Sequence, residues 1–108
     1  MVTIVIKDHA PNCLSNNDGQ IIQDLILPLM QAGQQVEVSF RGVYSATTSF
    51  INSAFVELLD YFDFARIKEF LKITDSNTHI NGLIKRRFES TLALRATPDY
   101  ATAGSIGS

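Results

Sequence analysis

The stretch that decides the fold is VEVSFRGVYSATTSFINSAFVELL, residues 36–59. It opens within QVEVSF, Gln35–Phe40, where apolar and polar side chains alternate and Val36, Val38 and Phe40 share one side, as in a β-strand. From Phe50 onward the apolar residues recur at helical spacing instead. The helical stripe consists of Phe50, Ile51, Ala54, Phe55, Leu58, Leu59 and Phe62. The stretch therefore predicts a strand that leads through a short turn into a helix.

The turn between this strand and this helix is rich in hydroxyl groups. Five serines and threonines lie between Gly42 and Phe55, and Thr47, Thr48 and Ser49 are consecutive. One such residue suffices to cap a helix, and we expect Thr47 to be the cap. The segment from Ser45 to Ser49, with Thr48 at its centre, is the candidate functional surface.

A similar change of period precedes this stretch. Val2–Lys7 is short and rich in β-branched residues, which predicts a strand, and the turn-forming residues of His9–Gly19 predict a loop. Asn17 or Asp18 is the expected N-cap of a first helix, and Gly33 is its expected C-terminal stop. The apolar stripe of this helix consists of Ile21, Ile22, Leu25, Ile26 and Leu29.

The same order follows the stretch. A linker at Asp63–Arg66 leads to a third strand, Glu69–Thr74, and Asp75-Ser76-Asn77 is a turn and cap cluster before a third helix. That helix carries the apolar residues Ile80, Leu83, Ile84, Phe88 and Leu92. The order β-α-β-α-β-α predicts one α/β domain at residues 1–96, with a mostly parallel sheet covered by helices. Residues 97–108 are small and polar without periodicity, and we expect a disordered tail.

Composition excludes several classes of protein. The chain has 108 residues, a net charge of -2 and 19% charged residues, which is ordinary for a globular domain and unattractive to phosphate backbones. No apolar run approaches the ~20 residues that span a bilayer, so we expect no membrane contact. Cys13 is the only cysteine, which excludes an internal disulfide and favours a reducing compartment. We therefore expect a cytoplasmic protein.

The chemistry-bearing residues form no recognised motif. Neither GxGxxG nor GxxxxGK[ST] occurs, and no G-x-S-x-G elbow presents a nucleophile. His9, His79 and Cys13 lack the spacing of metal ligands. The basic run Lys85-Arg86-Arg87 lacks aromatic neighbours and reads as a solvated helix face. We therefore expect no catalytic residues, no metal, no cofactor and no nucleic-acid partner.

The turn and the helix start resemble those of STAS domains, the family of bacterial anti-sigma-factor antagonists and of the cytosolic portions of sulfate transporters. In that family a strand runs through Gly-Val to Asp-Ser-Ser-Gly at a helix start, and Gly42-Val43 matches the Gly-Val pair. Thr47 then stands where the family has Asp. Thr48 stands at the serine that a partner kinase phosphorylates, Ser49 at the next serine, and Phe50 replaces the glycine.

A closer resemblance is to the STAS-like family of undefined function, a shorter bacterial and mobile-element group. Ser39-Phe40-Arg41-Gly42-Val43 looks like its Asp-Phe-x-Gly-Val strand end, with Ser39 in place of the acid. Thr48-Ser49-Phe50 looks like its helix start, and Gly19-Gln20 matches a glycine and polar residue that recur near the first helix. The resemblance covers roughly Val2 to Phe88 and implies a STAS-like fold.

The resemblance implies a non-enzymatic regulatory module that binds a protein partner of the kinase-type ATPase class. The contact and phosphorylation residues that it implies are Ser45, Thr47, Thr48 and Ser49. A helix start tolerates a phosphate, because unpaired backbone N–H groups and the helix dipole favour an anion there. The alternative is a small enzyme or a nucleotide- or anion-binding protein that uses the same loop.

We also predict self-association, to a homodimer or a larger oligomer. Three helices cannot cover both faces of a parallel sheet, and so few strands leave open edges. One group of apolar side chains exceeds what a single helical layer needs: Ile4, Ile6, Val36, Val38 and Phe40.

Overall fold

The computed structural model describes residues 1–10 and 15–96. Cys13 and the tail predicted at residues 97–108 lie outside this part of the chain. The elements, in chain order, are β1 (Val2–Val5), α1 (Ile6–His9), α2 (Asn16–Gln31), β2 (Val36–Ser39), α3 (Thr48–Ala54), the 3-10 helix η1 (Val56–Asp60), α4 (Phe64–Phe70), β3 (Leu71–Thr74) and α5 (Thr78–Ala96).

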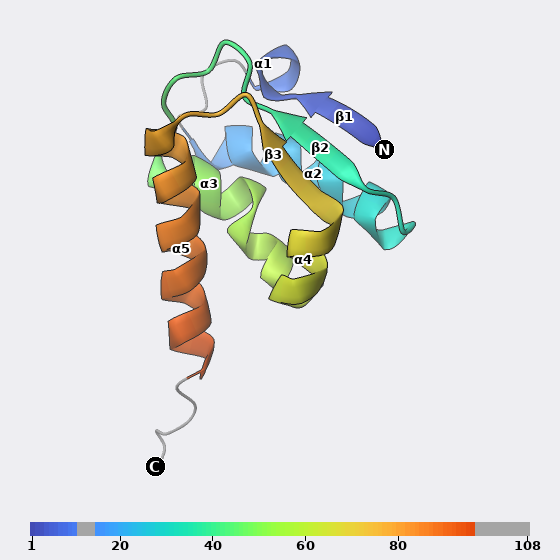
Figure 1. The fold of residues 1–108 in the computed structure, drawn as a ribbon, viewed down its shortest axis with the longest axis vertical. Coiled ribbons are helices and arrows are strands. Elements are labelled where there is room, and N and C mark those ends of the chain that lie inside the picture. The colour runs from blue at the N-terminus through green and yellow to red at the C-terminus, as the bar shows by residue number, and fades with distance from the viewer. Residues whose placement is uncertain (11–14, 97–108) are drawn as a thin grey trace.

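The three strands form one parallel sheet in the order β1-β2-β3 (Figure 1). In the register, Ile4 pairs with Val38, and Val38 pairs with Ile73. Because both crossovers step in the same direction, a common right hand puts the intervening helices on the same side of the sheet. Figure 1 shows α2 and α3 behind the strands, where they cover one face of the sheet. The predicted α/β class and parallel sheet are confirmed.

The two faces of the sheet differ in their side chains. Ile4, Val36 and Val38 point into the helical layer and are at most 5% exposed. On the other face, Thr3, Glu37 and Lys72 lie side by side in register, and Thr3 and Lys72 are exposed. The polar face explains how a parallel sheet can remain uncovered on one side.

α2 begins earlier than the sequence predicted. Its N-cap is Ser15, whose hydroxyl accepts a hydrogen bond from the Asp18 N–H at 3.2 Å, so both Asn17 and Asp18 were wrong as caps and the predicted loop was too long. The C-terminal stop at Gly33 is confirmed. Gly33 has φ +79°, and the Gln34 N–H donates to the Leu29 carbonyl at 2.9 Å, which closes the helix in a Schellman motif.

The second helix is shorter than its apolar stripe suggested. α3 ends at Ala54, and Phe55 leaves the helix with φ -124° before η1 continues the chain. Phe55 is fully buried and its ring lies 6.1 Å from that of Phe40 and 6.4 Å from that of Phe50, centroid to centroid. This aromatic cluster is the centre of the core, and its packing accompanies the break in the predicted continuous helix.

Three further predictions of local structure were wrong. Residues 63–66 were expected as a linker, but Asp63 caps α4, accepting from the Arg66 N–H at 2.9 Å. α4 extends through Phe70 and takes the first residues of the predicted strand Glu69–Thr74. Likewise the last residues of the predicted strand Val2–Lys7 form the short helix α1.

α5 is the longest helix of the described residues and is the last element in the chain order. The predicted cap cluster is confirmed at Asn77, whose Oδ1 accepts from the Ile80 N–H at 2.8 Å. Ile80 and Phe88 are buried against the core. Near the other end, Arg95 donates to the Leu59 carbonyl and pairs with Asp60 at 2.6 Å.

The predicted surplus of apolar side chains, on which self-association was partly based, is not present at the surface. Ile4, Ile6, Val36, Val38 and Phe40 are all at most 5% exposed within the single chain, because one helical layer covers them. The open strand edges are the remaining ground for that prediction.

Candidate functional site

The candidate surface begins at a tight turn after β2. The Val43 N–H donates to the Phe40 carbonyl at 2.8 Å, and Gly42 between them has φ +75°. This geometry is that of a type II turn, which requires glycine at its third position. The Lys7 side chain closes over the turn, since its Nζ lies 3.1 Å from the point that a Cβ at Gly42 would occupy. The Gly-Val pair of the resemblance is therefore a conformational requirement of the loop.

The middle of the loop is anchored to α5. Val43 and Ala46 are buried, and the Asn77 Nδ2 donates to the Tyr44 carbonyl at 2.9 Å. Asn77 caps α5 with its other side-chain atom, so one amide group holds the helix start and the loop together. The backbone at Tyr44 is thereby fixed relative to α5.

The start of α3 divides the hydroxyl groups into two kinds. Thr47 is half-buried, and its Oγ1 accepts from the Phe50 N–H at 3.1 Å, which confirms it as the predicted N-cap. Ser45, Thr48 and Ser49 are exposed, and within the described residues their hydroxyl groups make no hydrogen bond. These three side chains serve neither the cap nor the core.

Tyr44, which the sequence did not single out, directly precedes Ser45 and stands four residues before Thr48. Its side chain is 79% exposed, the largest fraction among the exposed large apolar side chains of the described chain. The sequence did carry a signal, since Tyr44 is the one aromatic residue between Val43 and Ser49, a segment rich in serine and threonine. The structure adds that its apolar neighbours Val43 and Ala46 are buried. We call Tyr44, Ser45, Thr48 and Ser49 the loop surface.

A partly buried polar contact, between buried Ser39 and exposed Asp75, lies next to this loop at the carboxyl end of the sheet. Ser39 is 3% exposed, and its hydroxyl donates to the Asp75 carboxylate at 2.6 Å while accepting from the Arg41 N–H at 3.2 Å. In the family motif an acidic residue stands at the position of Ser39. Here the acid comes instead from Asp75, which has φ 57°, a left-handed conformation that Asp tolerates.

The remaining candidate ligands are apart from one another. His9 ends α1 and His79 lies in the first turn of α5, and both are exposed. Across residues 1–10 and 15–96, no group of three or more His, Cys, Asp and Glu side chains is placed to hold a metal ion. The arrangement offers no constellation for metal chemistry in the described chain.

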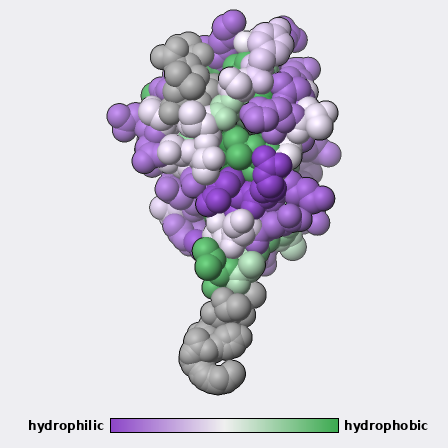
Figure 2. All heavy atoms as spheres, turned by 90° about the vertical axis from the view of Figure 1, so that its left-hand side faces the viewer, coloured by the Kyte–Doolittle hydropathy of each residue, from purple (hydrophilic) through white to green (hydrophobic). Residues whose placement is uncertain are grey.

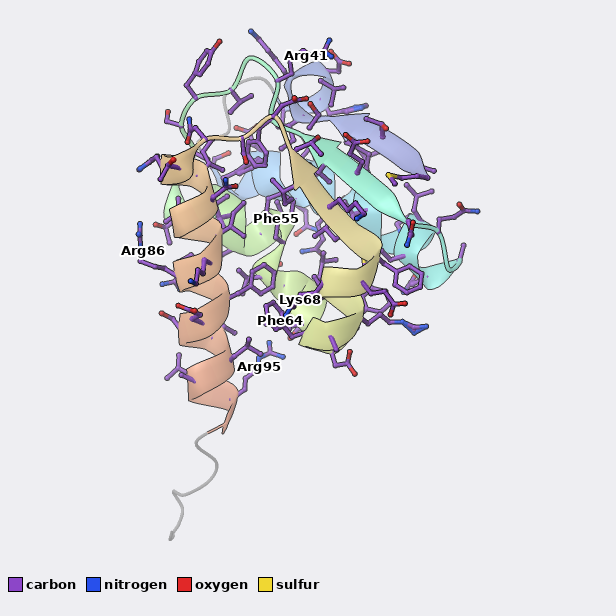
Figure 3. All side chains as sticks on the ribbon, viewed as in Figure 1. Arg41, Phe55, Phe64, Lys68, Arg86 and Arg95 are labelled. Atoms are coloured by element: carbon purple, nitrogen blue, oxygen red, sulfur yellow. The ribbon has the colours of Figure 1, made fainter. Side chains whose placement is uncertain are left out.

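The basic run of α5 lies on its outer side, as expected. Lys85 and Arg86 are exposed, Arg86 points away from the body, and this side of the molecule is mostly hydrophilic (Figures 2 and 3). Arg87 is half-buried, and its Nε donates to the Asn52 Oδ1 of α3 at 3.1 Å. Two of the three charges are therefore solvated, and the third joins α5 to α3.

No helix in the described part of the chain is long and apolar enough to cross a bilayer.

The comparisons with known proteins give one family. The family model described as a STAS-like domain of unknown function matches residues 18–81, which contain all but the first two residues of α2, the loop surface and α3. Neither curated proteins nor solved structures gave a match. The matched span is more than half of the chain and includes Gly19, Gly42 and the hydroxyl-rich helix start, so the protein belongs to the family of STAS-like domains of unknown function.

Proposed function

We propose that the protein is a non-enzymatic regulatory module that binds a protein partner through the loop surface. The observation that carries this proposal is the state of Tyr44, whose side chain is 79% exposed on a backbone that Asn77 fixes. An aromatic side chain held in this way loses little conformational entropy on binding and can bury a large area. Tyrosine is accordingly frequent at the energetic centres of protein interfaces.

The hydroxyl groups beside Tyr44 suit a polar rim or a regulatory modification. Thr48 is the first residue of α3, exposed and unbonded within the described residues. A phosphate there would meet the unpaired N–H groups of the first helical turn and would leave the core untouched. Its added charge would instead act on a partner docked at Tyr44. The likeness to STAS domains makes a kinase-type ATPase the proposed partner. The single cysteine, which favours a reducing compartment, makes the cytoplasm the proposed location.

Affinity capture with a matched pair of tyrosine variants tests this proposal. Tyr61 is also exposed, at 54%, but lies between η1 and α4, outside the loop surface. We expect Tyr44→Ala to lose a protein that the parent and Tyr61→Ala both capture from the native host. Calorimetry with that purified protein then measures the affinities. Equal affinity for the parent and Tyr44→Ala would exclude the loop surface as the contact.

The competing function is that of a small enzyme or a nucleotide- or anion-binding protein at the same loop. It is favoured by Lys7, whose ammonium group lies against the Gly42 turn and makes no ion pair within the described residues. A thermal-shift assay with ATP, GTP and inorganic phosphate distinguishes the two functions. A rise in Tm that Lys7→Ala abolishes would favour anion binding over the protein-partner proposal.

Self-association stays a prediction that rests on the open edges of the sheet. Light scattering over a range of protein concentrations measures it. A mass that stays at 12.0 kDa at high concentration would contradict it.

A further inference from the structure

The outer edge of β3 carries unpaired backbone groups. β3 ends the sheet, and the Phe40 N–H donates to the Thr74 carbonyl at 2.9 Å, so the backbone of Thr74 faces β2. Because backbone groups alternate in direction along a strand, those of the preceding Ile73 face outward. Within the described residues, neither the N–H nor the carbonyl of Ile73 has a hydrogen-bond partner. Such an edge is a template for another strand.

An apolar pocket opens beside the same strand. It has a volume of about 170 Å³ and lies between α4, β3 and α5. Figure 3 shows Phe64 and Lys68 in the space between α4 and α5. The pocket is lined by Phe55, Phe64, Ile67, Lys68, Leu71, Ile73, Ile84 and Phe88. Ile73 therefore contributes its side chain to the pocket and its unpaired backbone to the edge.

The size of the pocket indicates what it can hold. Sites for cofactors and drug-sized ligands occupy about 300–1,000 Å³, well above the 170 Å³ found here. A cavity of about 150 Å³ lined by apolar side chains accepts one benzene molecule. The pocket thus matches a single large side chain, such as phenylalanine, leucine or methionine.

The one charged residue of the lining is Lys68. Its Nζ lies 5.3 Å from the centroid of the Phe64 ring, and the side chain is exposed. Within the described part of the chain, Lys68 makes no ion pair. An acidic group on a molecule bound in the pocket could therefore form an ion pair with the Lys68 ammonium group.

We propose that β3 binds an extended peptide segment of a partner as a fourth strand of the sheet. The peptide would exchange backbone hydrogen bonds with Ile73, insert one large apolar side chain into the pocket, and place an acidic residue near Lys68. Backbone bonds supply affinity in this mode of recognition, and the pocket supplies specificity. No residue of this site belongs to the loop surface, so the two proposals stand or fall separately.

The occupant is a peptide rather than a second copy of this chain. Residues of α5 line the pocket together with residues of β3 and α4. A second copy paired through its own β3 would bring another α5 to this edge, whereas an extended peptide brings only its own strand.

Amide hydrogen exchange measured by NMR tests the proposal in the full chain. The probe is a capped hexapeptide of threonine and valine with a central phenylalanine followed by glutamate. Saturating peptide should slow exchange of the Ile73 amide at least about tenfold, because a new hydrogen bond protects it. The Thr3 amide is the internal control. The Val2 N–H donates to the Gln35 carbonyl at 2.9 Å, so alternation turns Thr3 to the other open edge, that of β1, which contributes no residue to this pocket.

Variants of the probe and of the protein separate the three parts of the site. Replacing the phenylalanine of the peptide with alanine, or methylating its backbone nitrogen, should abolish the protection. Lys68→Glu should raise the Kd at least about tenfold, since it puts like charges together. Lys72→Glu makes the same charge change on the opposite face of β3 and should leave the Kd within about twofold, as expected for an exposed charge outside the contact.

Three results would overturn the proposal. The first is unchanged exchange at Ile73 with millimolar peptide, and the second is equal protection of Thr3 and Ile73. The third is protection of Ile73 that rises with protein concentration without peptide, which would assign the edge to a second copy. Thr48→Glu should bind the peptide with the same Kd as the parent, because Thr48 lies outside this site. A failure of the loop-surface proposal would therefore not change the result of this experiment.

Discussion

Single residues determine how closely the elements of this fold approach. Gly19 of α2 is buried where α2 crosses α3, and a Cβ there would lie 2.6 Å from the Phe50 carbonyl oxygen and 2.7 Å from the Ser53 Cβ. Neither atom is the end of a flexible side chain, so the helices would have to separate. We expect Gly19→Ala to lower the free energy of unfolding by about 1–3 kcal/mol, as overpacking does.

Gly82→Ala is the matched control, since Gly82 also lies inside a helix. A Cβ there meets only the Arg86 Nη1 at 3.3 Å, at the end of a side chain that can move. Alanine should therefore stabilise α5 by up to about 1 kcal/mol through its helix propensity. Urea unfolding measures both variants. A Gly19→Ala protein as stable as the parent would contradict the close approach of α2 and α3.

Asn77 has two roles that two substitutions can separate. Asn77→Ala removes both the cap of α5 and the hydrogen bond to the Tyr44 carbonyl. It should lower the free energy of unfolding by about 1–2 kcal/mol. Asn77→Asp keeps an oxygen for the cap but loses the amide donor. It should retain most of the stability while amides of residues 41–47 exchange faster. Mass-spectrometric hydrogen exchange measures the loop, and unchanged exchange in Asn77→Asp would mean that the bond does not hold it.

At this scale, the sequence predicted only what is local. Thr47 was predictable as a cap because its partner, the Phe50 N–H, is three residues away. The anchor of Tyr44 joins residues 33 apart, and the Ser39–Asp75 bond joins residues 36 apart. Such contacts depend on how the strands and α5 assemble, which no periodicity reports.

At the scale of elements, the main strands and helices followed from the change of period, and the errors have common physical causes. The apolar run through Ile6 concealed the point where β1 ends and α1 begins. α4 was missed because it is a seven-residue helix that runs directly into β3, so the two apolar patterns merge. The break after α3 occurs at Phe55, whose apolar character fits either a helix or the core.

The start of α3 is the element whose charge we expect to control binding. Thr48→Glu places a carboxylate in the first turn of a helix, where the dipole makes it neutral or mildly stabilising. The melting temperature should stay nearly unchanged. Affinity for the captured partner should fall by about 1 kcal/mol or more, as expected for a charge placed in a desolvated contact. Melting curves and calorimetry measure the two effects.

Thr48→Ala is the control for this prediction. It should keep binding largely intact if the hydroxyl group acts only as a phosphorylation site, because the Thr48 hydroxyl makes no hydrogen bond within the described residues. If Thr48→Glu bound the partner as tightly as the parent, the loop surface would not be the contact. Its hydroxyl groups would then only cap the helix or face solvent.

At the scale of the whole molecule, the helices cover one face of a parallel sheet and leave a polar face and two edges open. Thr3 and Lys72 are exposed on that face, whereas Val38 on the other is fully buried. The alternation of QVEVSF predicted which side chains share a face. It could not predict that one face stays uncovered, because that depends on the strand order.

Adjacent residues of the central strand test this arrangement directly. Val38 is 0% exposed in the helical layer, and Val38→Ala should cost about 2–3 kcal/mol, as removal of buried methyl groups leaves a cavity. Glu37 is the next residue and lies on the other face, where it accepts a hydrogen bond from the exposed Thr3 hydroxyl at 3.3 Å. Threonine has a higher strand propensity than glutamate, so Glu37→Thr should not weaken β2. It should change the free energy of unfolding by less than about 0.5 kcal/mol, as surface substitutions do. Urea unfolding at several protein concentrations measures both. A large, concentration-dependent loss in Glu37→Thr would show that a second copy covers this face.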